Sequence, residues 1–413
     1  MKKIICIILG IMLTFSHSGM TSVASEGEYV NLSEAIDDAL NNDAEDDSNE
    51  KNSDLEISSK SAILMEAQTG KVIFCKNEDE SLRPASVTKI MTLLLIFEEI
   101  QRGNMRYDDI VTVTEHAASM GGSQCFFEAG EQQIVEDMIK CIEVASGNDA
   151  AVAMAEHIAG SEAAFVEMMN ARAKELGMEN THFENACGLE AEGHVTSAKD
   201  IAIMSRELIV NHPEIFNYST IWMDSIIHKT KKGESQFDLA NTNKFLKQYT
   251  GATGLKTGYT SQAKYCISAT AKRNDIELIA VIMGAETKEI RNSEIARMLD
   301  YGFAKCEIYT DSQVVPGNQK FKVSMGVKEY VDFDVENTNK ITLLEGNVEE
   351  IKKELVIYEN LEAPIHLGDI IGVVQYTYKG QLIDEVYVYA AEDVKKKSYG
   401  HSIKDLMKKI FMM

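Results

Sequence analysis

The sequence predicts an α+β domain followed by a small all-β domain. Two strand patterns lie before a block of helical patterns, and three strand patterns and one more helix follow that block. Strands at both ends of a helical block predict a single sheet assembled from both ends of one domain. Beyond about residue 305 the chain contains only short alternating or apolar runs, which predict a separate all-β domain. A length of 413 residues fits two or three domains better than one.

The first predicted elements are a hairpin and a buried helix. Apolar runs at residues 62–65 and 71–74 flank a turn that contains Gly70, which indicates two antiparallel strands. Pro84 suits the first turn of a helix, where its missing N–H is not needed. Residues 90–97 are apolar on nearly all sides, so we expect the helix to be buried.

The middle of the chain is predicted to be helical. Periodic apolar positions indicate helices between residues 131 and 175, and a further helix at 198–210 is opened by the run 196–200, which offers a hydroxyl cap and an acid in the first turn. Later patterns, rich in β-branched and aromatic residues, predict three strands and then a helix, at 254–259, 265–272, 276–284 and 293–304.

The all-β domain is predicted from short runs separated by Gly, Asn and Pro, at 320–327, 330–335, 341–344, 352–358, 370–378 and 381–390. This region contains no evident catalytic constellation, so we expect it to act as a spacer. We therefore assign residues 58–305 to a catalytic domain and residues 306–394 to an all-β domain.

The N-terminal segment has the pattern of a secretory signal. Lys2 and Lys3 precede a short apolar run at 4–15, and small residues at 22–25 offer a cleavage site. The apolar run is too short for the roughly 20 residues that cross a bilayer. We therefore expect residues 1–25 to be a signal peptide that exports the protein.

Two further segments are predicted to lie outside the folded domains. Residues 26–57 are acidic and poor in large apolar side chains, which predicts a disordered tether. Residues 395–413 combine lysines with an apolar stripe, a pattern typical of an amphipathic helix on a membrane surface. Packing on its own domain is the alternative, but anionic lipids attract each lysine by about 1 kcal/mol. We expect the protein at the outer face of the cytoplasmic membrane.

Composition excludes several classes of function. A net charge of −24 argues against nucleic acid as a partner. The chain has no C-x-x-C or H-E-x-x-H spacing, so we expect no zinc site, and no other metal or cofactor is implied. Pairing stays open for the six cysteines beyond the signal, Cys75, Cys125, Cys141, Cys187, Cys266 and Cys306.

A hydroxyl and an amine lie one helical turn apart at the start of the predicted buried helix. Ser86 and Lys89 are three positions apart, so their side chains share one face. The free N–H groups of a helix N-terminus favour a developing negative charge, and a desolvated lysine can take the proton of a serine nucleophile. The same spacing also occurs at 48–51 and 261–264, so it does not identify a site alone.

A second motif lies between two predicted helices. Ser146, Gly147 and Asn148 form a turn there, so their side chains can point into a cleft. Ser146 can pass a proton between Lys89 and a leaving amine, and Asn148 can hydrogen-bond a substrate amide. Taken alone, these three residues are better explained as an ordinary turn.

A third motif lies in a predicted strand. Lys256 is costly inside a buried sheet unless it is paired or used, and Gly258 allows a ligand to lie against the strand edge. Together with Thr257 they offer a cation and a hydroxyl to an anionic group. The three motifs in this order predict a serine acyl-transfer site, because they are the set by which penicillin-binding proteins and class A β-lactamases are recognised.

The motifs resemble those of the low-molecular-weight penicillin-binding proteins, the serine-type D-alanyl-D-alanine carboxypeptidases of peptidase family S11. The resemblance rests on the segments 84–92, 146–151 and 254–260 and extends from about Ser58 to the C-terminal helix. It implies a penicillin-binding-protein/β-lactamase-like catalytic domain. The segment 254–271 looks most like the sporulation-associated branch in Gram-positive bacteria.

The resemblance also implies roles for the site residues. Ser86 would be the nucleophile and Lys89 its base, and Ser146 and Asn148 would complete the proton path and contact the substrate amide. The remaining roles are an oxyanion hole from the backbone N–H groups of Ser86 and Tyr259, and a carboxylate site from Lys256, Thr257 and Arg291. An arginine can hold a carboxylate through two hydrogen bonds.

The expected substrates are peptidoglycan stem peptides ending in D-Ala-D-Ala, with β-lactams as inhibitors. A β-lactamase or a D,D-endopeptidase on the same site is one alternative, and a catalytically silent cell-wall scaffold protein is another. Glu207 faintly resembles the glutamate that drives deacylation in β-lactamases, but it lies on an apolar predicted helix, so we expect a surface acid there.

Overall fold

The computed structural model describes residues 55–413 apart from 232, 316–320, 337, 345, 358–360, 401–402, 404–406 and 408–413. The predicted signal peptide at 1–25 lies outside the described residues. The predicted acidic segment at 26–57 overlaps them only at 55–57, where Ile57 is buried. Of the predicted C-terminal helix, Ile403 and Met407 are helical and exposed, and most of the remainder lies outside the described part.

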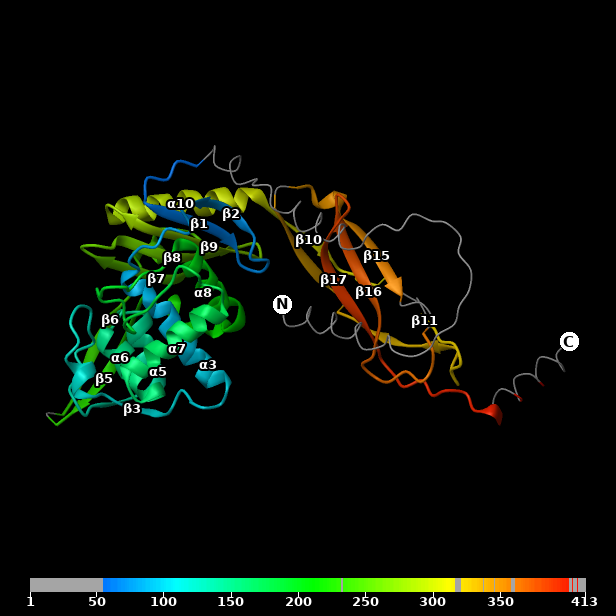
Figure 1. Ribbon diagram of the computed structural model, residues 1–413, viewed down its shortest axis with the longest axis horizontal. Helices are drawn as coiled ribbons and strands as arrows, with labels where there is room; N and C mark the ends of the chain where they lie inside the picture. Colours follow the sequence, from blue (N-terminus) through cyan, green and yellow to red (C-terminus); the bar gives the residue numbers. More distant parts are fainter. Residues whose placement is uncertain are drawn as a thin grey trace, which may run out of the picture. The chain divides into compact units, whose positions relative to one another are not determined.

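A five-stranded antiparallel sheet organises the α+β domain (Figure 1). Its strand order is β2-β1-β9-β8-β7. The first hairpin therefore joins the late strands through its β1, which pairs with a strand more than 200 residues later, as the sequence predicts. The strands are β1 (Ser61–Glu66), β2 (Val72–Lys76), β7 (Ala252–Thr260), β8 (Lys264–Arg273) and β9 (Ile276–Ala285).

Helices cover both faces of this sheet. Figure 1 shows α10 (Lys288–Lys305) on one face and α8 (Ala198–Asn211) with the helical cluster on the other. Successive residues of a strand point to opposite faces, so β1 contributes Ile63 to the core beside the helical cluster and Leu64 to the core beneath α10. The cluster comprises α3 (Lys89–Gln101), α5 (Val135–Glu143), α6 (Asn148–Ala159) and α7 (Glu162–Glu175).

The predicted buried helix begins later than the sequence suggests. Ala85–Thr88 form a 3-10 turn, in which the Val87 N–H donates to the Pro84 carbonyl (3.3 Å), and α3 starts only at Lys89. The expectation that Ser86 lies at the α-helix N-terminus is therefore wrong. The cause is the backbone of Ala85, whose φ of +49° is incompatible with a helix running back to Pro84.

Several short elements were not predicted, among them the exposed β5–β6 hairpin. They are β3 (Ile110–Thr112), α4 (Glu115–Ala118), β4 (Gln132–Ile134), η2 (Pro213–Ile215), α9 (Phe216–Ser219), β5 (Met223–Thr230), β6 (Gly233–Ala240) and η3 (Lys244–Lys247).

The second domain is all-β, as predicted. A four-stranded sheet of order β13-β17-β16-β15 accompanies two two-stranded sheets, β10-β14 and β11-β12. Tyr376 is fully buried in its core, and its hydroxyl donates to Asp311 (2.8 Å). The elements are β10 (Cys306–Asp311), β11 (Phe321–Lys322), β12 (Tyr330–Val331), β13 (Phe333–Asp334), β14 (Asn339–Leu344), η4 (Val348–Glu350), β15 (Lys352–Ile357), β16 (Ile370–Tyr378) and β17 (Gln381–Ala390).

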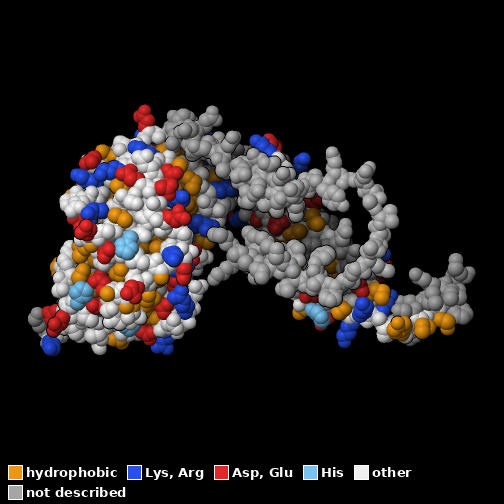
Figure 2. All heavy atoms as spheres, viewed as in Figure 1, with side chains coloured by type: hydrophobic (Ala, Val, Ile, Leu, Met, Phe, Trp, Pro, Cys, Tyr) orange, Lys and Arg blue, Asp and Glu red, His pale blue; other side chains and the backbone are white. Residues whose placement is uncertain are grey.

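Acidic and basic side chains are interspersed over the face of the α+β domain that Figure 2 shows. Within the part of the chain that the structure describes, no helix is both long and apolar enough to cross a membrane.

Candidate active site

Ser86 and Lys89 lie in contact at the junction of the 3-10 turn and α3. The Nζ atom of Lys89 is 3.2 Å from Ser86 Oγ, and the lysine is fully buried. Two other acceptors lie even closer to Nζ, namely Asn148 Oδ1 at 2.6 Å and the Cys187 carbonyl at 2.7 Å.

These contacts accommodate the neutral form of the lysine, which is the form that can act as a base. Burial above all, together with the nearby charge of Lys256, lowers the pKa of Lys89 from 10.5 to about 7. A neutral amine has two N–H groups, which the two carbonyl-type acceptors take up. Its lone pair is then left for the hydroxyl proton of Ser86, which is the arrangement that a general base requires.

Ser146 and Asn148 lie in the turn between α5 and α6. Ser146 has a φ of +60°, a conformation that is rare outside glycine. Asn148 is fixed by its backbone N–H, which donates to Ser123 (2.7 Å), and by Nδ2, which donates to the Gly121 carbonyl (2.6 Å). Ser146 lines the same cavity as Ser86, but among the described residues it is not a hydrogen-bond partner of Lys89 Nζ.

The third motif lies in β7, an edge strand that passes against the Ser86 turn. A Cβ atom added to Gly258 would lie 3.0 Å from the Ser86 nitrogen, so glycine permits this close approach. Thr257 Oγ1 donates to Thr242 Oγ1 (3.4 Å), and Tyr259 is exposed. Lys256 is fully buried, and Nζ has no hydrogen-bond partner among the described residues.

Arg291 lies in the first turn of α10. The sequence places the start of this helix at 293, but Thr287 caps it and the helix begins at Lys288. Arg291 Nη1 donates to the Cys266 carbonyl (3.3 Å), and Nε donates to Asn292 Oδ1 (3.0 Å). Burial lowers the pKa of Arg291 to about 10, so the guanidinium stays charged at neutral pH.

One cavity of about 840 Å³ connects the three motifs. Ser86, Ser146 and Arg291 all line it, and Lys89, Asn148 and Lys256 are buried behind its wall. The other lining residues are Ser123, Thr242, Lys244, Phe245, Gln248, Thr257, Gly258, Tyr259, Tyr265, Lys288, Glu289, Asn292, Ser293 and Ala296. The described residues contain no group of three or more His, Cys, Asp or Glu side chains placed to hold a metal ion.

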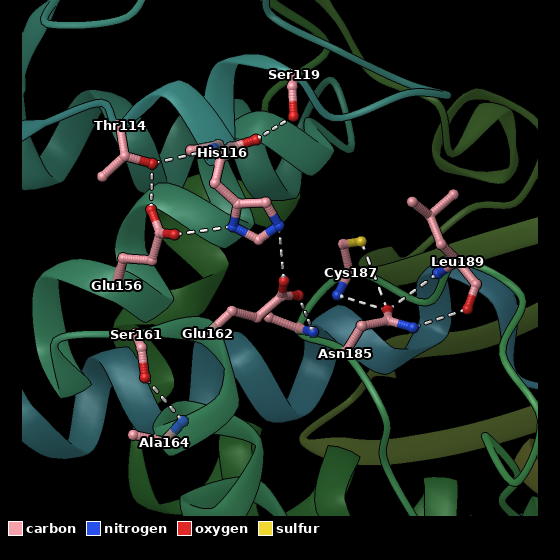
Figure 3. A network of polar contacts seen from close by, with 12 residues as sticks. Thr114, His116, Ser119, Glu156, Ser161, Glu162, Ala164, Asn185, Cys187 and Leu189 are labelled. Carbon is pink, nitrogen blue, oxygen red and sulfur yellow. Dashed lines mark hydrogen bonds and ion pairs between the residues drawn. The ribbon is translucent and has the colours of Figure 1, made fainter.

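Residues 185–189 hold the backbone carbonyl that accepts from Lys89 and were missed by sequence reasoning. Asn185 Oδ1 accepts hydrogen bonds from the backbone N–H groups of Cys187 (3.2 Å), Gly188 (2.7 Å) and Leu189 (3.1 Å). This fixes the Cys187 carbonyl that accepts from Lys89. Figure 3 shows the same loop beside Glu162, which accepts from the Ala186 N–H (3.0 Å).

Gly188 packs directly against the Ser86 turn. Its φ is +87°, and a Cβ atom there would lie 1.9 Å from the Ala85 carbonyl oxygen. No signal in the sequence identifies this contact, because the two segments are about 100 positions apart.

His194 holds the turn from another side, and sequence reasoning missed it as well. Its Nδ1 accepts from the Glu184 N–H (3.0 Å), so Nε2 carries the proton and donates to Thr88 Oγ1 (2.8 Å). Burial lowers the pKa of His194 from 6.5 to about 4, in agreement with a neutral ring. Glu207 is ion-paired with Arg172 (2.6 Å) and does not line the active-site cavity.

Known protein families match both domains of this chain. The family described as D-alanyl-D-alanine carboxypeptidase, peptidase S11, matches residues 47–287, and the penicillin-binding protein 5 C-terminal domain matches residues 303–396. D-alanyl-D-alanine carboxypeptidase DacF of Bacillus subtilis (strain 168) is 43% identical over 353 residues, covering 84% of this chain and 89% of the relative. DacA of Escherichia coli (strain K12) is 30% identical over 366 residues, covering 86% and 88%.

The fold agrees as well. Penicillin-binding protein 5 from Haemophilus influenzae superposes with a TM-score of 0.67 at 30% identity, covering 83% of this chain and 99% of that one. The predicted penicillin-binding-protein-like fold is thereby confirmed. The chain belongs to the D-alanyl-D-alanine carboxypeptidase family, peptidase S11.

Proposed function

We propose that this protein is a serine-type D-alanyl-D-alanine carboxypeptidase that removes the terminal D-alanine from peptidoglycan pentapeptide stems. The observation that carries the proposal is the contact of Lys89 Nζ with both Ser86 Oγ and Asn148 Oδ1, beside a cavity that Thr257 and Arg291 also line. The family and its curated relatives support the same activity.

The reaction begins with attack of Ser86 Oγ on the carbonyl of the penultimate D-alanine. Lys89 takes the hydroxyl proton, and Ser146 passes a proton to the leaving amine. The backbone N–H groups of Ser86 and Tyr259 stabilise the oxyanion, an effect worth about 3–4 kcal/mol for a donor of this kind. Water then hydrolyses the acyl-enzyme on Ser86 and regenerates the hydroxyl.

The free carboxylate distinguishes a carboxypeptidase substrate from an internal peptide bond. Thr257 and Arg291 line the cavity, and Lys256 lies buried behind it in the same strand as Thr257. We assign these three residues to the terminal carboxylate, because a hydroxyl and fixed cations bind that group with charge-assisted hydrogen bonds. A β-lactam carries a carboxylate and a reactive carbonyl, so it acylates Ser86 in place of the substrate.

The test is release of D-alanine from a peptide ending in D-Ala-D-Ala, compared with turnover of a cross-linked muropeptide and of a penicillin. The proposal predicts turnover of the peptide that Ser86→Ala abolishes. Preferred cleavage of the cross-linked muropeptide would indicate an endopeptidase, and rapid penicillin turnover a β-lactamase. Unchanged cell-wall stem lengths in a Ser86→Ala strain would indicate a scaffold protein.

The substrate implies an extracytoplasmic location, and we propose that the protein acts in the cell-wall space, at the outer face of the cytoplasmic membrane. In this arrangement residues 1–25 export the chain, residues 58–305 carry the activity, and residues 306–394 separate it from an anchor at 395–413. The exposed side chains of Tyr399, Ile403 and Met407 support an apolar anchor, and Figure 2 shows hydrophobic side chains gathered in that region. A chain truncated at Glu392 should leave the membrane fraction, and its retention there would rule out this helix as the main anchor.

A further inference from the structure

Glu143 is a buried acid near the active site that belongs to none of the three motifs. It is the last residue of α5, three positions before Ser146, and it is 1% exposed. Both of its carboxylate oxygens are buried without a hydrogen-bond partner among the described residues. Because acids are almost never fully buried unless they are paired, this position calls for a counter-charge.

Lys256 is the complementary group. Its Nζ atom is also buried without a hydrogen-bond partner in the part of the chain that the structure describes. Burial lowers the pKa of Lys256, and interaction with Glu143 raises it; burial raises the pKa of Glu143, and interaction with Lys256 lowers it. Each group therefore favours the charged form of the other. Lys89 is a second cation that interacts with Lys256, and repulsion between the two disfavours charge on both.

A single loop fixes the two elements that carry this pair. The Thr242 N–H donates to the carbonyl of Val144 (3.1 Å), directly after Glu143. The Thr242 hydroxyl accepts from Thr257 (3.4 Å), directly after Lys256. Thr242 and Thr257 both line the active-site cavity, so the end of α5 and the middle of β7 are held together at its edge.

We propose that Glu143 is a positioning residue for substrate recognition, which keeps Lys256 as an ammonium ion so that the terminal carboxylate of the substrate meets a fixed cation. The inference rests on the proposed carboxylate-binding role of Lys256. Glu143 does not touch the substrate, since it is fully buried and does not line the cavity.

The interaction with Glu143 explains how Lys256 stays charged beside Lys89. Without an acid at position 143, Lys256 would be buried with no compensating charge, and it would lose its proton at a lower pH. The substrate carboxylate would then be bound more weakly as the pH rises. Binding of the substrate carboxylate involves no general base. Loss of the charge on Lys256 should therefore lower substrate affinity and leave the rate of the chemical step nearly unchanged.

The experiment compares the wild type with Glu143→Gln, which removes the charge and keeps the size, and Glu143→Asp, which keeps the charge. Glu277→Gln is the matched control, because Glu277 is another buried acid with an unpartnered oxygen, on β9, that does not line the cavity. The substrates are an acyl peptide ending in D-Ala-D-Ala and an acyl-D-alanine p-nitrophenyl ester, which reacts with Ser86 but lacks the terminal carboxylate. KM and kcat are measured from pH 6 to pH 9.

We expect Glu143→Gln to raise KM for the peptide by about fivefold at pH 8 and by close to tenfold at pH 9, as follows from a fall of one unit in the pKa of Lys256 from its value of about 8. The increase should become smaller toward pH 6, and kcat and ester hydrolysis should stay within about threefold of wild type. Glu143→Asp should restore most of the affinity, and Glu277→Gln should match the wild type. An unchanged KM at every pH, or an equal loss on peptide and ester, would overturn the inference.

Failure of the proposed function would look different. In that case the wild type would release no D-alanine from the peptide. The rate of penicillin acylation then tests the role of Glu143, because penicillin also carries a carboxylate that Lys256 can bind. A slower acylation of Glu143→Gln that worsens with rising pH supports the inference, and wild-type rates at all pH values contradict it.

Discussion

The Nζ atom of Lys89 lies 2.6 Å from Oδ1 of Asn148, so the lysine one turn from Ser86 is joined to the first residue of α6. The acceptor is a neutral amide, and so is the other close acceptor, the Cys187 carbonyl. Neither acceptor carries a full charge that would hold the lysine as an ammonium ion. The fold thus fixes the position of Lys89 while burial keeps its pKa near 7.

Asn148→Asp should therefore move the acidic limb of the acylation rate to higher pH. A carboxylate at 2.6 Å favours the ammonium form, and we expect a displacement of about one pH unit or more. The measurement is the rate of acylation by a fluorescent penicillin between pH 5.5 and 9.5. Asn104→Asp, at an exposed position, is the control and should leave the profile in place. A displacement toward lower pH would contradict the assignment of Lys89 as the base.

Wild-type acylation should rise with pH and level off above the pKa of Lys89. The amine acts in its neutral form, so each pH unit below about 7 should slow acylation about tenfold. Lys89→Arg should lose roughly a hundredfold or more, because arginine remains protonated and cannot accept the serine proton. A flat profile between pH 5.5 and 8.5, with near-normal rates for the arginine variant, would exclude general-base catalysis by this residue.

Gly188→Ala should disrupt the 3-10 turn that contains Ser86. The added methyl group would lie 1.9 Å from the Ala85 carbonyl oxygen at a residue with a φ of +87°, so the loop and the turn must separate. We expect a loss of several kcal/mol in the free energy of unfolding, on the order of 3 or more, and loss of penicillin labelling.

Gly160→Ala provides the matched control for this change. Its φ of +80° is similar, but nothing lies within 4 Å of the added atom. This variant should lose only about 1 kcal/mol and retain penicillin labelling. Similar behaviour of the two variants would show that the contact with Ala85 is unimportant.

His194 should make the protein sensitive to acid. Folding lowers its pKa from 6.5 to about 4, so the unfolded chain takes up a proton before the folded one does. Its contribution is fully present above pH 6.5 and is lost as the pH falls toward 4, by roughly 3 kcal/mol in all. Urea unfolding of wild type and His194→Gln at pH 7.5, 6.0 and 4.5 measures this. His194→Gln should have a lower free energy of unfolding than the wild type at pH 7.5 and should lose less of it on acidification. The control His157→Gln, at an exposed position, should lose as much as the wild type. An equal loss of unfolding free energy between pH 7.5 and 4.5 in all three proteins would refute the assignment.

Local patterns predicted much of the fold. The hairpin at β1 and β2, the late strands and the helix after Ser197 follow from periodicity and capping, and Ser197 Oγ accepts from the Asp200 N–H (3.1 Å) as a cap does. The spacing of Ser86 and Lys89 was sufficient to place both side chains on one face, even though the turn proved to be 3-10. The order of the three motifs along the chain predicted that Ser146, Asn148 and Lys256 belong to the same site as Ser86.

Long-range contacts account for what was missed. Asn185 and Gly188 act on Lys89 and Ala85 from a loop without periodicity, and His194 reaches Thr88 across more than 100 positions. Glu143 ends an amphipathic helix, where an acid ordinarily faces solvent, and only the fold shows that it is buried and interacts electrostatically with Lys256.

The most direct measurement is mass spectrometry of the intact protein and its tryptic peptides after exposure to penicillin. If Ser86 is the activated nucleophile, one penicilloyl group should appear on the peptide that contains Ser86, and Ser86→Ala should remain unmodified. A wild-type protein that stays unlabelled, or a label on a different residue, would contradict the assignment of this site.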